Sequence, residues 1–210
     1  IKKNCSVLSE DFIQWVIEEK FSAPFPDIDE LESVNITKNV IPYEETKIRV
    51  LNGGHSCLAY LGALMGLKTF DECFKKKNLD SFFYDLEIKE IIPSLGNNIP
   101  FDLTKYLNTI YERFQNSNIS DALERICMDG SSKFPIFVLP TIKKCFEMNI
   151  EPINGITAIA SWYVFMKKIN NKELSFDYID PKWVWLKNFL KEDKIDDFCS
   201  NKDLWGELPE

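Results

Sequence analysis

Apolar residues along this chain recur at helical rather than alternating spacing, so the pattern predicts a mainly α-helical fold. The spacing predicts helices over residues 9–21, 42–65, 102–114, 119–128 and 154–168, and a two-part amphipathic stretch over 69–90. No alternating run is long enough for a convincing strand, and we expect only a short extended piece within 34–41. With no internal repeat or linker, residues 1–210 are expected to form a single multi-helix domain.

Prolines, glycines and aromatic residues divide this pattern into segments. Residues 92–99 are rich in Pro, Gly and Asn and predict a loop, and Pro135 and Pro140 are expected to break any helix over 133–148. The tail from Asp180 reads as helical and acidic. Its expected anchors in the core are aromatic: Trp183, Trp185, Phe189 and Trp205.

The longest uncharged run, Val50 to Leu67, reads as a buried helix that enters from a polar site. Asn52, Gly53, Gly54, His55 and Ser56 stand near its start, where a membrane span would not place them. We expect the two adjacent glycines to weaken or kink the helix. Gly62 and Gly66 form a G-x-x-x-G pair, which in this setting predicts close packing between helices.

Composition narrows the classes of partner. The 210 residues carry a formal net charge of −8, so nucleic acid and anionic membranes are not expected as partners. The sequence holds one histidine, which excludes a histidine-rich metal site within the chain, and we expect no metal. Its eight glycines form neither a dinucleotide-binding fingerprint nor a phosphate-binding loop.

Cysteine usage and the N-terminus predict the compartment. The six cysteines form no C-x-x-C pair and several stand in apolar stretches, so buried free thiols in a reducing compartment are expected. No basic region followed by an apolar core resembles a signal peptide, and a cytoplasmic location is expected. The chain starts at Ile1 without Met, which indicates a fragment or a processed chain.

One constellation could carry chemistry. Lys47, Asn52 and His55 stand at offsets of 0, +5 and +8. On an α-helical wheel these offsets fall at about 0°, 140° and 80°, which places all three on one side. A buried lysine with a lowered pKa could take the proton of a secondary alcohol, while an amide and an imidazole donate to its oxygen. From spacing alone, a surface lysine beside a structural core histidine is the favoured explanation of the pattern.

The segment that carries this constellation resembles a known family. K-I-R-V-L-N-G-G-H-S-C-L-A-Y-L-G, residues 47–62, is similar to the signature of the long-chain mannitol dehydrogenases, a family of polyol and hexuronate oxidoreductases. Further matching blocks lie upstream and downstream of this segment, in the family's order across residues 14–142. They are Gln14–Glu18, Pro42–Glu44, Arg113–Asn116, Arg125–Lys133 and Leu139–Ile142.

The resemblance implies roles for five residues. It makes Lys47 the general base, Asn52 and His55 the pair that polarises the reacting oxygen, and Arg125 and Lys133 the residues that hold other substrate oxygens. Multidentate donors suit a polyol chain or a carboxylate. Arg125 in an ordinary ion pair with Asp121 or Asp129, and Lys133 in solvent, remain alternatives.

The resemblance also implies what lies outside the chain. Members of the family consist of a Rossmann domain followed by a mostly helical domain, and this chain is similar to the second of these domains. NAD or NADP would therefore be bound mainly by an N-terminal domain absent here. The expected reaction interconverts a polyol and a ketose, such as mannitol and fructose. The alternatives are a hexuronate reductase acting on fructuronate or tagaturonate, or a non-catalytic helical interaction module.

Overall fold

Two short parallel strands form the N-terminal part of the described chain. The computed structural model describes residues 12–190 and 194–206. Contacts between residues divide the chain into two compact units, with the boundary between Glu44 and Glu45. In the first unit, β1 (Trp15–Glu18) pairs with β2 (Val34–Thr37), so that Trp15 lies opposite Val34. Strand β2 confirms the expected extended piece within 34–41.

The helix expected over 9–21 is wrong for its described part, which contains β1. Residues 9–11 lie outside the described residues. Val16 and Ile17 are β-branched and favour a strand. Phe12 and Trp15 remain 39% and 57% exposed, so they do not form the apolar face that the helical spacing predicted.

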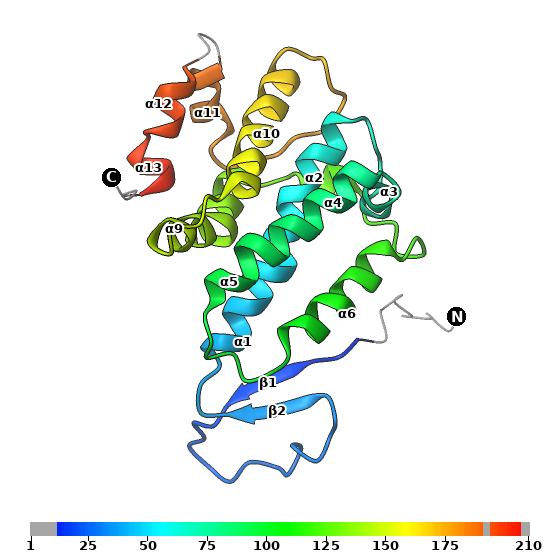
Figure 1. Cartoon of the computed structure of the whole chain (residues 1–210), viewed down its shortest axis with the longest axis vertical. Helices are drawn as coiled ribbons and strands as arrows, with labels where there is room; N and C mark the ends of the chain where they lie inside the picture. Colours follow the sequence, from blue (N-terminus) through cyan, green and yellow to red (C-terminus); the bar gives the residue numbers. More distant parts are fainter. Residues whose placement is uncertain (1–11, 191–193, 207–210) are drawn as a thin grey trace, which may run out of the picture. The chain divides into compact units, whose positions relative to one another are not determined.

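The expected multi-helix domain is confirmed in the second unit (Figure 1). α-Helical and π-helical segments follow one another along the chain, and some join end to end without a loop. In order they are α1 (Ile41–Thr46), η1 (Lys47–Gly53), α2 (Gly54–Leu64), α3 (Phe70–Phe74), α4 (Lys77–Leu86), η2 (Glu87–Ile91), α5 (Ile92–Leu95), α6 (Leu103–Gln115), α7 (Leu123–Ile126), α8 (Gly130–Lys133), η3 (Phe134–Val138), α9 (Leu139–Glu147), α10 (Ile153–Asn170), α11 (Trp183–Leu190), α12 (Ile195–Cys199) and α13 (Lys202–Trp205).

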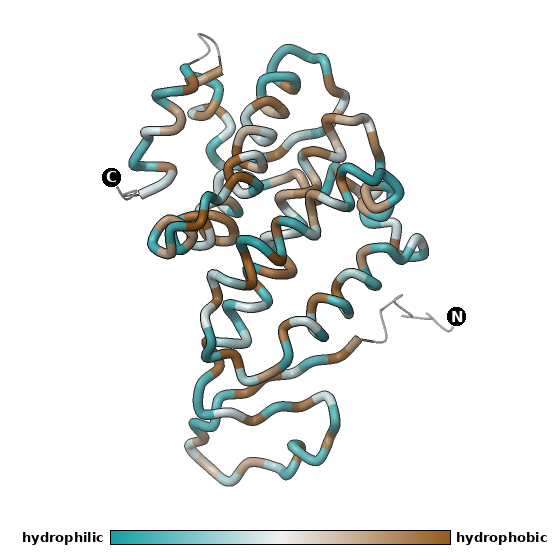
Figure 2. The backbone as a smooth tube through the Cα atoms, viewed as in Figure 1, coloured by the Kyte–Doolittle hydropathy of each residue, from teal (hydrophilic) through white to brown (hydrophobic). Residues whose placement is uncertain are grey.

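Helix α2 lies at the centre of the helical unit. It packs along α10 and against α4 and α7 (Figure 1). Hydrophobic stretches of these helices lie in the region where they pack (Figure 2). Tyr60 of α2 is fully buried beside Phe134 and Phe165. Phe134 in turn stacks on Trp162 with ring centroids 4.9 Å apart. Burial of these large rings makes α2 a rigid base for the residues at its N-terminal end.

The adjacent glycines of α2 allow close packing and do not break the helix. Gly53 and Gly54 both have right-handed helical φ and ψ, and the chain continues helically from α1 to Leu64. A Cβ on Gly53 would lie 2.9 Å from the carbonyl oxygen of Phe137 in η3. A Cβ on Gly54 would lie 2.2 Å from a carboxyl oxygen of Glu87 in η2. The expected kink is therefore replaced by a close approach of three π-helical segments.

The G-x-x-x-G pair has two separate explanations. Gly62 faces Cys73 and Leu123, which a Cβ would meet at 2.5 and 3.1 Å, so this half of the pair serves packing as expected. Gly66 has a φ of +77° and nothing near its missing side chain. It ends the helix in a left-handed conformation, the usual role of glycine after a helix.

Several breaks expected from proline fall inside helical structure. Pro93, Pro135 and Pro140 each lie in the first turn of a segment, where a missing N–H costs little. The expected loop over 92–99 therefore begins only after α5, at Gly96 with a φ of +75°. The helix expected over 119–128 shrinks to α7, because Ser120 takes a positive φ of 46°.

Other expectations are confirmed. Asp102 caps α6 by accepting from the N–H groups of Thr104 and Lys105. Cys57, Cys73, Cys127 and Cys145 are buried free thiols, Cys199 is an exposed one, and Cys5 lies outside the described residues.

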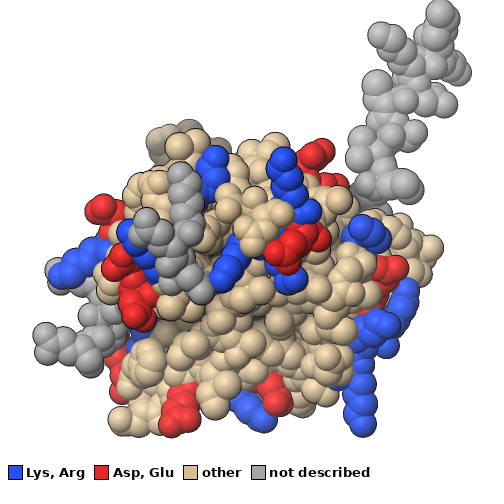
Figure 3. Space-filling view, turned by 90° about the horizontal axis from the view of Figure 1, so that it is seen from above, with Lys and Arg blue, Asp and Glu red and all other residues tan. Residues whose placement is uncertain are grey.

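The described helices and surface add two observations. None of the described helices combines the length and apolar character that a membrane crossing requires. On the face shown in Figure 3, acidic and basic side chains are interspersed rather than gathered into a field of one sign.

Candidate active site

The signature segment begins in a π-helix, which changes the geometry expected for Lys47 and Asn52. Both residues lie in η1 and are five positions apart. Hydrogen bonds of a π-helix join residues i and i+5, so residues at this spacing lie on the same side in successive turns. The α-helical wheel set them about 140° apart, and that value is wrong here. The π-helix brings them closer to one face.

Burial differs between these two residues. Lys47 is exposed, and we find no hydrogen bond or ion pair of its ammonium group within 12–190 and 194–206. Asn52 is half-buried. The expected lysine is a buried one, so this chain by itself does not supply the burial on which that argument rested. The structure also shows no direct contact that joins Lys47 to His55.

Arg49 holds the π-helix in place from the opposite side. Its guanidinium is buried, donates from Nε to the Thr141 hydroxyl at 3.1 Å, and also donates to the Ser94 hydroxyl. Burial lowers the pKa of Arg49, but a guanidinium stays charged under all ordinary conditions. These bonds tie η1 to α5 and α9, which fixes the segment that carries Lys47 and Asn52.

His55 lies in the first turn of α2 between two aromatic rings. Its imidazole meets the edge of Phe70 with centroids 4.2 Å apart and stacks on Phe114 at 5.0 Å. The side chain is 16% exposed. The rings leave the imidazole little freedom to turn and keep most water from it.

Three charged residues from the α7–α8 region act electrostatically on His55. The imidazole Nε2 lies 3.8 Å from a carboxyl oxygen of Asp121. Burial lowers the pKa of His55 to about 4; Asp121 opposes this effect, while Arg125 and Lys133 add to it. His55 is therefore neutral near pH 7 and has one N–H to donate.

Arg125 is an exposed residue held by an acidic neighbour. Its guanidinium donates to both carboxyl oxygens of Asp121, with Nε to Oδ1 at 2.8 Å. This is the ion pair that the sequence left open as an alternative. The paired geometry orients the guanidinium and leaves its remaining N–H groups available, so an ion pair and a substrate contact are compatible.

Lys133 is half-buried, in contrast to the solvent-exposed alternative. Its ammonium donates to the carbonyl of Ile126 at 2.9 Å. Burial lowers its pKa, and the nearby Asp129 carboxylate opposes that effect. The chain turns sharply just before Lys133. Asp129, whose φ of 58° is left-handed, and Gly130, which packs against Trp162, fix this turn.

Asp180 anchors the turn that aims Lys133. Its carboxylate accepts from the Ser131 N–H at 2.9 Å and from the Ser131 hydroxyl at 2.6 Å. The Tyr60 hydroxyl donates to the carbonyl of Cys127 at 2.8 Å, just before the same turn. Residues far apart in sequence thus fix the turn that carries Lys133, whose charge acts on His55.

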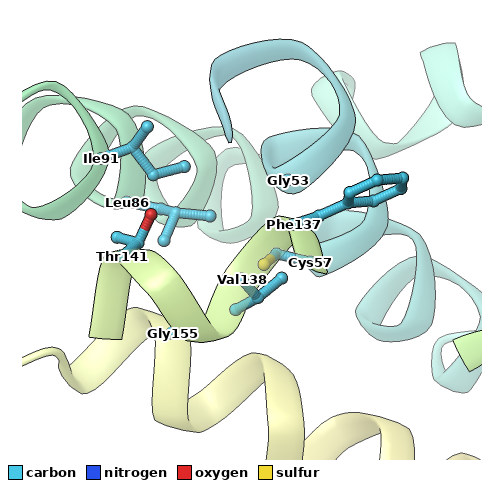
Figure 4. Close-up of a pocket in the computed structure, with 8 residues that line it drawn as sticks. All are labelled: Gly53, Cys57, Leu86, Ile91, Phe137, Val138, Thr141 and Gly155. Atoms are coloured by element: carbon cyan, nitrogen blue, oxygen red, sulfur yellow. The ribbon is translucent and has the colours of Figure 1, made fainter. Parts of the chain in front are cut away.

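A small hollow near this site is a packing seam. It lies where η1, η2 and η3 meet and has no room for a water molecule (Figure 4). Its lining contains none of the five predicted site residues and no charged group. The lining residues are Gly53, Cys57, Leu86, Ile91, Phe137, Val138, Thr141 and Gly155.

The described residues do not fit a dinucleotide by themselves. Their one sheet is the β1–β2 pair, and the glycines of η1 and α2 serve helix packing. Over the same residues, no group of three or more His, Cys, Asp or Glu side chains could hold a metal ion. The groups gathered around His55 are hydrogen-bond donors and one carboxylate, a set that suits hydroxyl oxygens.

The structure thus brings together His55, Arg125 and Lys133, with Asn52 and Lys47 on the helix that leads into His55. Sequence reasoning missed Phe70 and Phe114 as the rings that hold the imidazole. It named Asp121 only as an ion-pair partner. Phe114 could have been found, because it stands in a block that carries the resemblance.

Known proteins with similar sequences are polyol dehydrogenases. A D-arabinitol 4-dehydrogenase of Ralstonia nicotianae is 35% identical over 99% of this chain and 45% of its own length. A mannitol 2-dehydrogenase of Cereibacter sphaeroides is 29% identical over 96% of the chain and 43% of its own length. The chain therefore spans less than half of these relatives.

A solved structure also matches. Mannitol 2-dehydrogenase of Pseudomonas fluorescens, in a ternary complex with NAD and D-mannitol, matches 93% of this chain and 40% of its own. The TM-score is 0.83 at 32% identity. The family model of the mannitol dehydrogenase C-terminal domain matches residues 39–210. The chain belongs to the mannitol dehydrogenase family and corresponds to its C-terminal domain.

Proposed function

We propose that this chain is the substrate-binding and catalytic part of an NAD(P)-dependent, metal-independent oxidoreductase that interconverts a polyol and a ketose. The observation that carries the proposal is that His55, at the start of α2, lies 3.8 Å from the Asp121 carboxylate that holds Arg125. The charge of Lys133 also acts on this imidazole, and Lys47 and Asn52 lie in η1, which leads directly into α2. The nicotinamide, held by a domain outside this chain, would supply hydride acceptance.

The residues of this chain would handle the proton and the oxygen atoms. Lys47, as a free amine, would take the hydroxyl proton, and a domain covering its exposed side chain would supply the missing burial. Asn52 and the neutral His55 would donate hydrogen bonds to the oxygen as negative charge develops on it. Arg125 and Lys133 would hold neighbouring hydroxyl groups through their free N–H groups.

A polyol is the favoured substrate class because the similar proteins above are named for arabinitol and mannitol. A substrate panel on the full-length protein should contain D-mannitol, D-arabinitol, D-sorbitol, fructuronate and tagaturonate. Oxidation of at least one polyol supports the proposal. Strong preference for a hexuronate would place the protein in the alternative class, and no turnover of any would favour a non-catalytic module.

The Lys47→Ala variant tests the proposed base. We expect kcat for polyol oxidation to fall by at least about a hundredfold, with an unchanged fold by circular dichroism. Lys105→Ala, which removes an exposed lysine from α6, is the matched control and should keep its rate. Wild-type rates in Lys47→Ala would overturn the assignment.

A further inference from the structure

We propose that Asp121 is a positioning residue of this site, which fixes the Arg125 guanidinium and keeps the single proton of His55 on Nε2. The proposal deepens the proposed function and rests on it for the catalytic consequence. Its structural part concerns the state of one imidazole and can be tested without turnover.

The backbone holds Asp121 firmly in place. Its carbonyl accepts from the N–H of Phe70 at 2.9 Å, and Phe70 is one of the two rings against His55. The next residues continue this attachment, since Leu123 donates to the carbonyl of Lys68 at 3.0 Å. Ser120, directly before Asp121, has a φ of 46°, a conformation that is costly for a residue with a side chain. The chain is thus turned so that the Asp121 carboxylate faces His55.

The Asp121 carboxylate contacts the Arg125 guanidinium and the His55 imidazole unequally. Both of its oxygens accept from Arg125, which fixes the plane of the guanidinium. The oxygen Oδ2 also lies 3.8 Å from Nε2 of His55, which is too long for a hydrogen bond but short for an electrostatic contact. The Asp121 side chain is only 23% exposed, so solvent screens this contact incompletely.

This contact selects one form of the neutral imidazole. The charged groups that face His55 are Asp121, Arg125 and Lys133, whereas α3 and α6 present only the rings of Phe70 and Phe114. An N–H directed at a carboxylate is favoured over a lone pair directed at it, so the proton belongs on Nε2. A neutral His55 then presents its Nε2–H on the side of the Asp121–Arg125 pair. A substrate oxygen held by Arg125 would need a hydrogen-bond donor on this side.

The lone histidine makes the test direct. Selective ¹⁵N labelling of histidine in this 210-residue chain, purified without a histidine tag, reports His55 alone. At pH 7 we expect a protonated-type shift for Nε2 and an unprotonated-type shift for Nδ1. The reverse assignment in the wild type would overturn the proposal, whether or not any variant folds.

Variants test whether Asp121 causes this state. Asp121→Asn removes the charge, and Asp121→Ala removes the carboxyl group altogether. We expect both to mix the two ¹⁵N patterns and to lower the pKa of His55 further, because the anion that opposes its depression is gone. Glu112→Gln is the matched control, because it removes an equal charge from the exposed surface of α6 and Glu112 is not among the charged groups that face His55. Unchanged signals in folded Asp121 variants would contradict the proposal.

Kinetics in the full-length protein separate this role from simple stabilisation. We expect Asp121→Asn to raise KM for the polyol through a loosened Arg125, and to lower kcat through a misplaced His55 proton, for a loss of about tenfold or more in kcat/KM. Glu112→Gln should change neither parameter. Without any polyol turnover in the wild type the proposed function fails, and the ¹⁵N result still decides the role of Asp121.

Discussion

The imidazole of His55 stacks on Phe114 with ring planes 21° apart, and this contact excludes water from one face of the imidazole. Phe114→Leu would open that side to water. Because burial is the largest cause of its low pKa, we expect the pKa of His55 to rise from about 4 toward 6.5. Histidine-selective NMR titration measures it. Phe101→Leu, an aromatic substitution whose ring pairs with Tyr106, should leave the titration unchanged; an equal shift in both variants would contradict the stacking argument.

The depressed pKa of His55 also predicts how stability depends on pH. Between pH 6.5 and about 4 the unfolded chain binds a proton at this residue and the folded chain does not. The free energy of unfolding should therefore fall as pH drops through that window, by about 3 kcal/mol for this one group. Urea unfolding of the wild type and His55→Gln at pH 7 and pH 4 isolates the contribution as a difference. An identical pH dependence in both proteins would refute it.

Glu87 should have the opposite pH dependence. Its carboxyl group is fully buried beside Gly54, neither oxygen has a hydrogen-bond partner among the described residues, and burial raises its pKa well above 4.5. The folded chain keeps this proton while the unfolded chain loses it, so stability falls as pH rises above 4.5. Glu87→Gln keeps the shape without an ionisable group. We expect this variant to gain stability over the wild type at pH 8 and little at pH 4, in urea unfolding at both values.

Glu90 has a different role although it lies in the same π-helix. Its carboxylate accepts from the backbone N–H groups of Asn154 and Gly155 at 2.6 and 2.8 Å, which caps the start of α10 from outside. Glu90→Gln should lower the free energy of unfolding by about 1–3 kcal/mol at pH 7. Glu151→Gln removes an exposed carboxylate from the same helix end and should cost less than about 0.5 kcal/mol. Equal losses of unfolding free energy in Glu90→Gln and Glu151→Gln would show that removing a negative charge, and not the cap, causes the destabilisation.

The sequence predicted the long amphipathic and apolar helices well because their burial follows a simple period. The Asp102 cap and α10 lie close to where the pattern placed them. The strand at Val16–Ile17 was missed because a four-residue strand offers too few positions to distinguish two periods. The prolines misled because a proline in a first turn and one that ends a helix look alike in sequence.

The site was only partly predictable for a related reason. The spacing of Lys47, Asn52 and His55 identified the helix, and the resemblance added Arg125 and Lys133. The contacts of His55 with Phe70, Phe114 and Asp121 join separate helices, and no local pattern encodes them. The exposure of Lys47 was equally hidden, since a lysine beside buried residues can face either way.

The π-helix at Lys47–Gly53 gives the five-residue spacing of the signature a physical meaning. Each turn there holds about one residue more than an α-helical turn, equivalent to a single-residue insertion. Deleting one residue between Lys47 and Asn52 would restore an ordinary helix and rotate everything upstream by about 100°, while the buried downstream helix stayed in register. The interval between the lysine and the asparagine is therefore set by the type of helix that joins them.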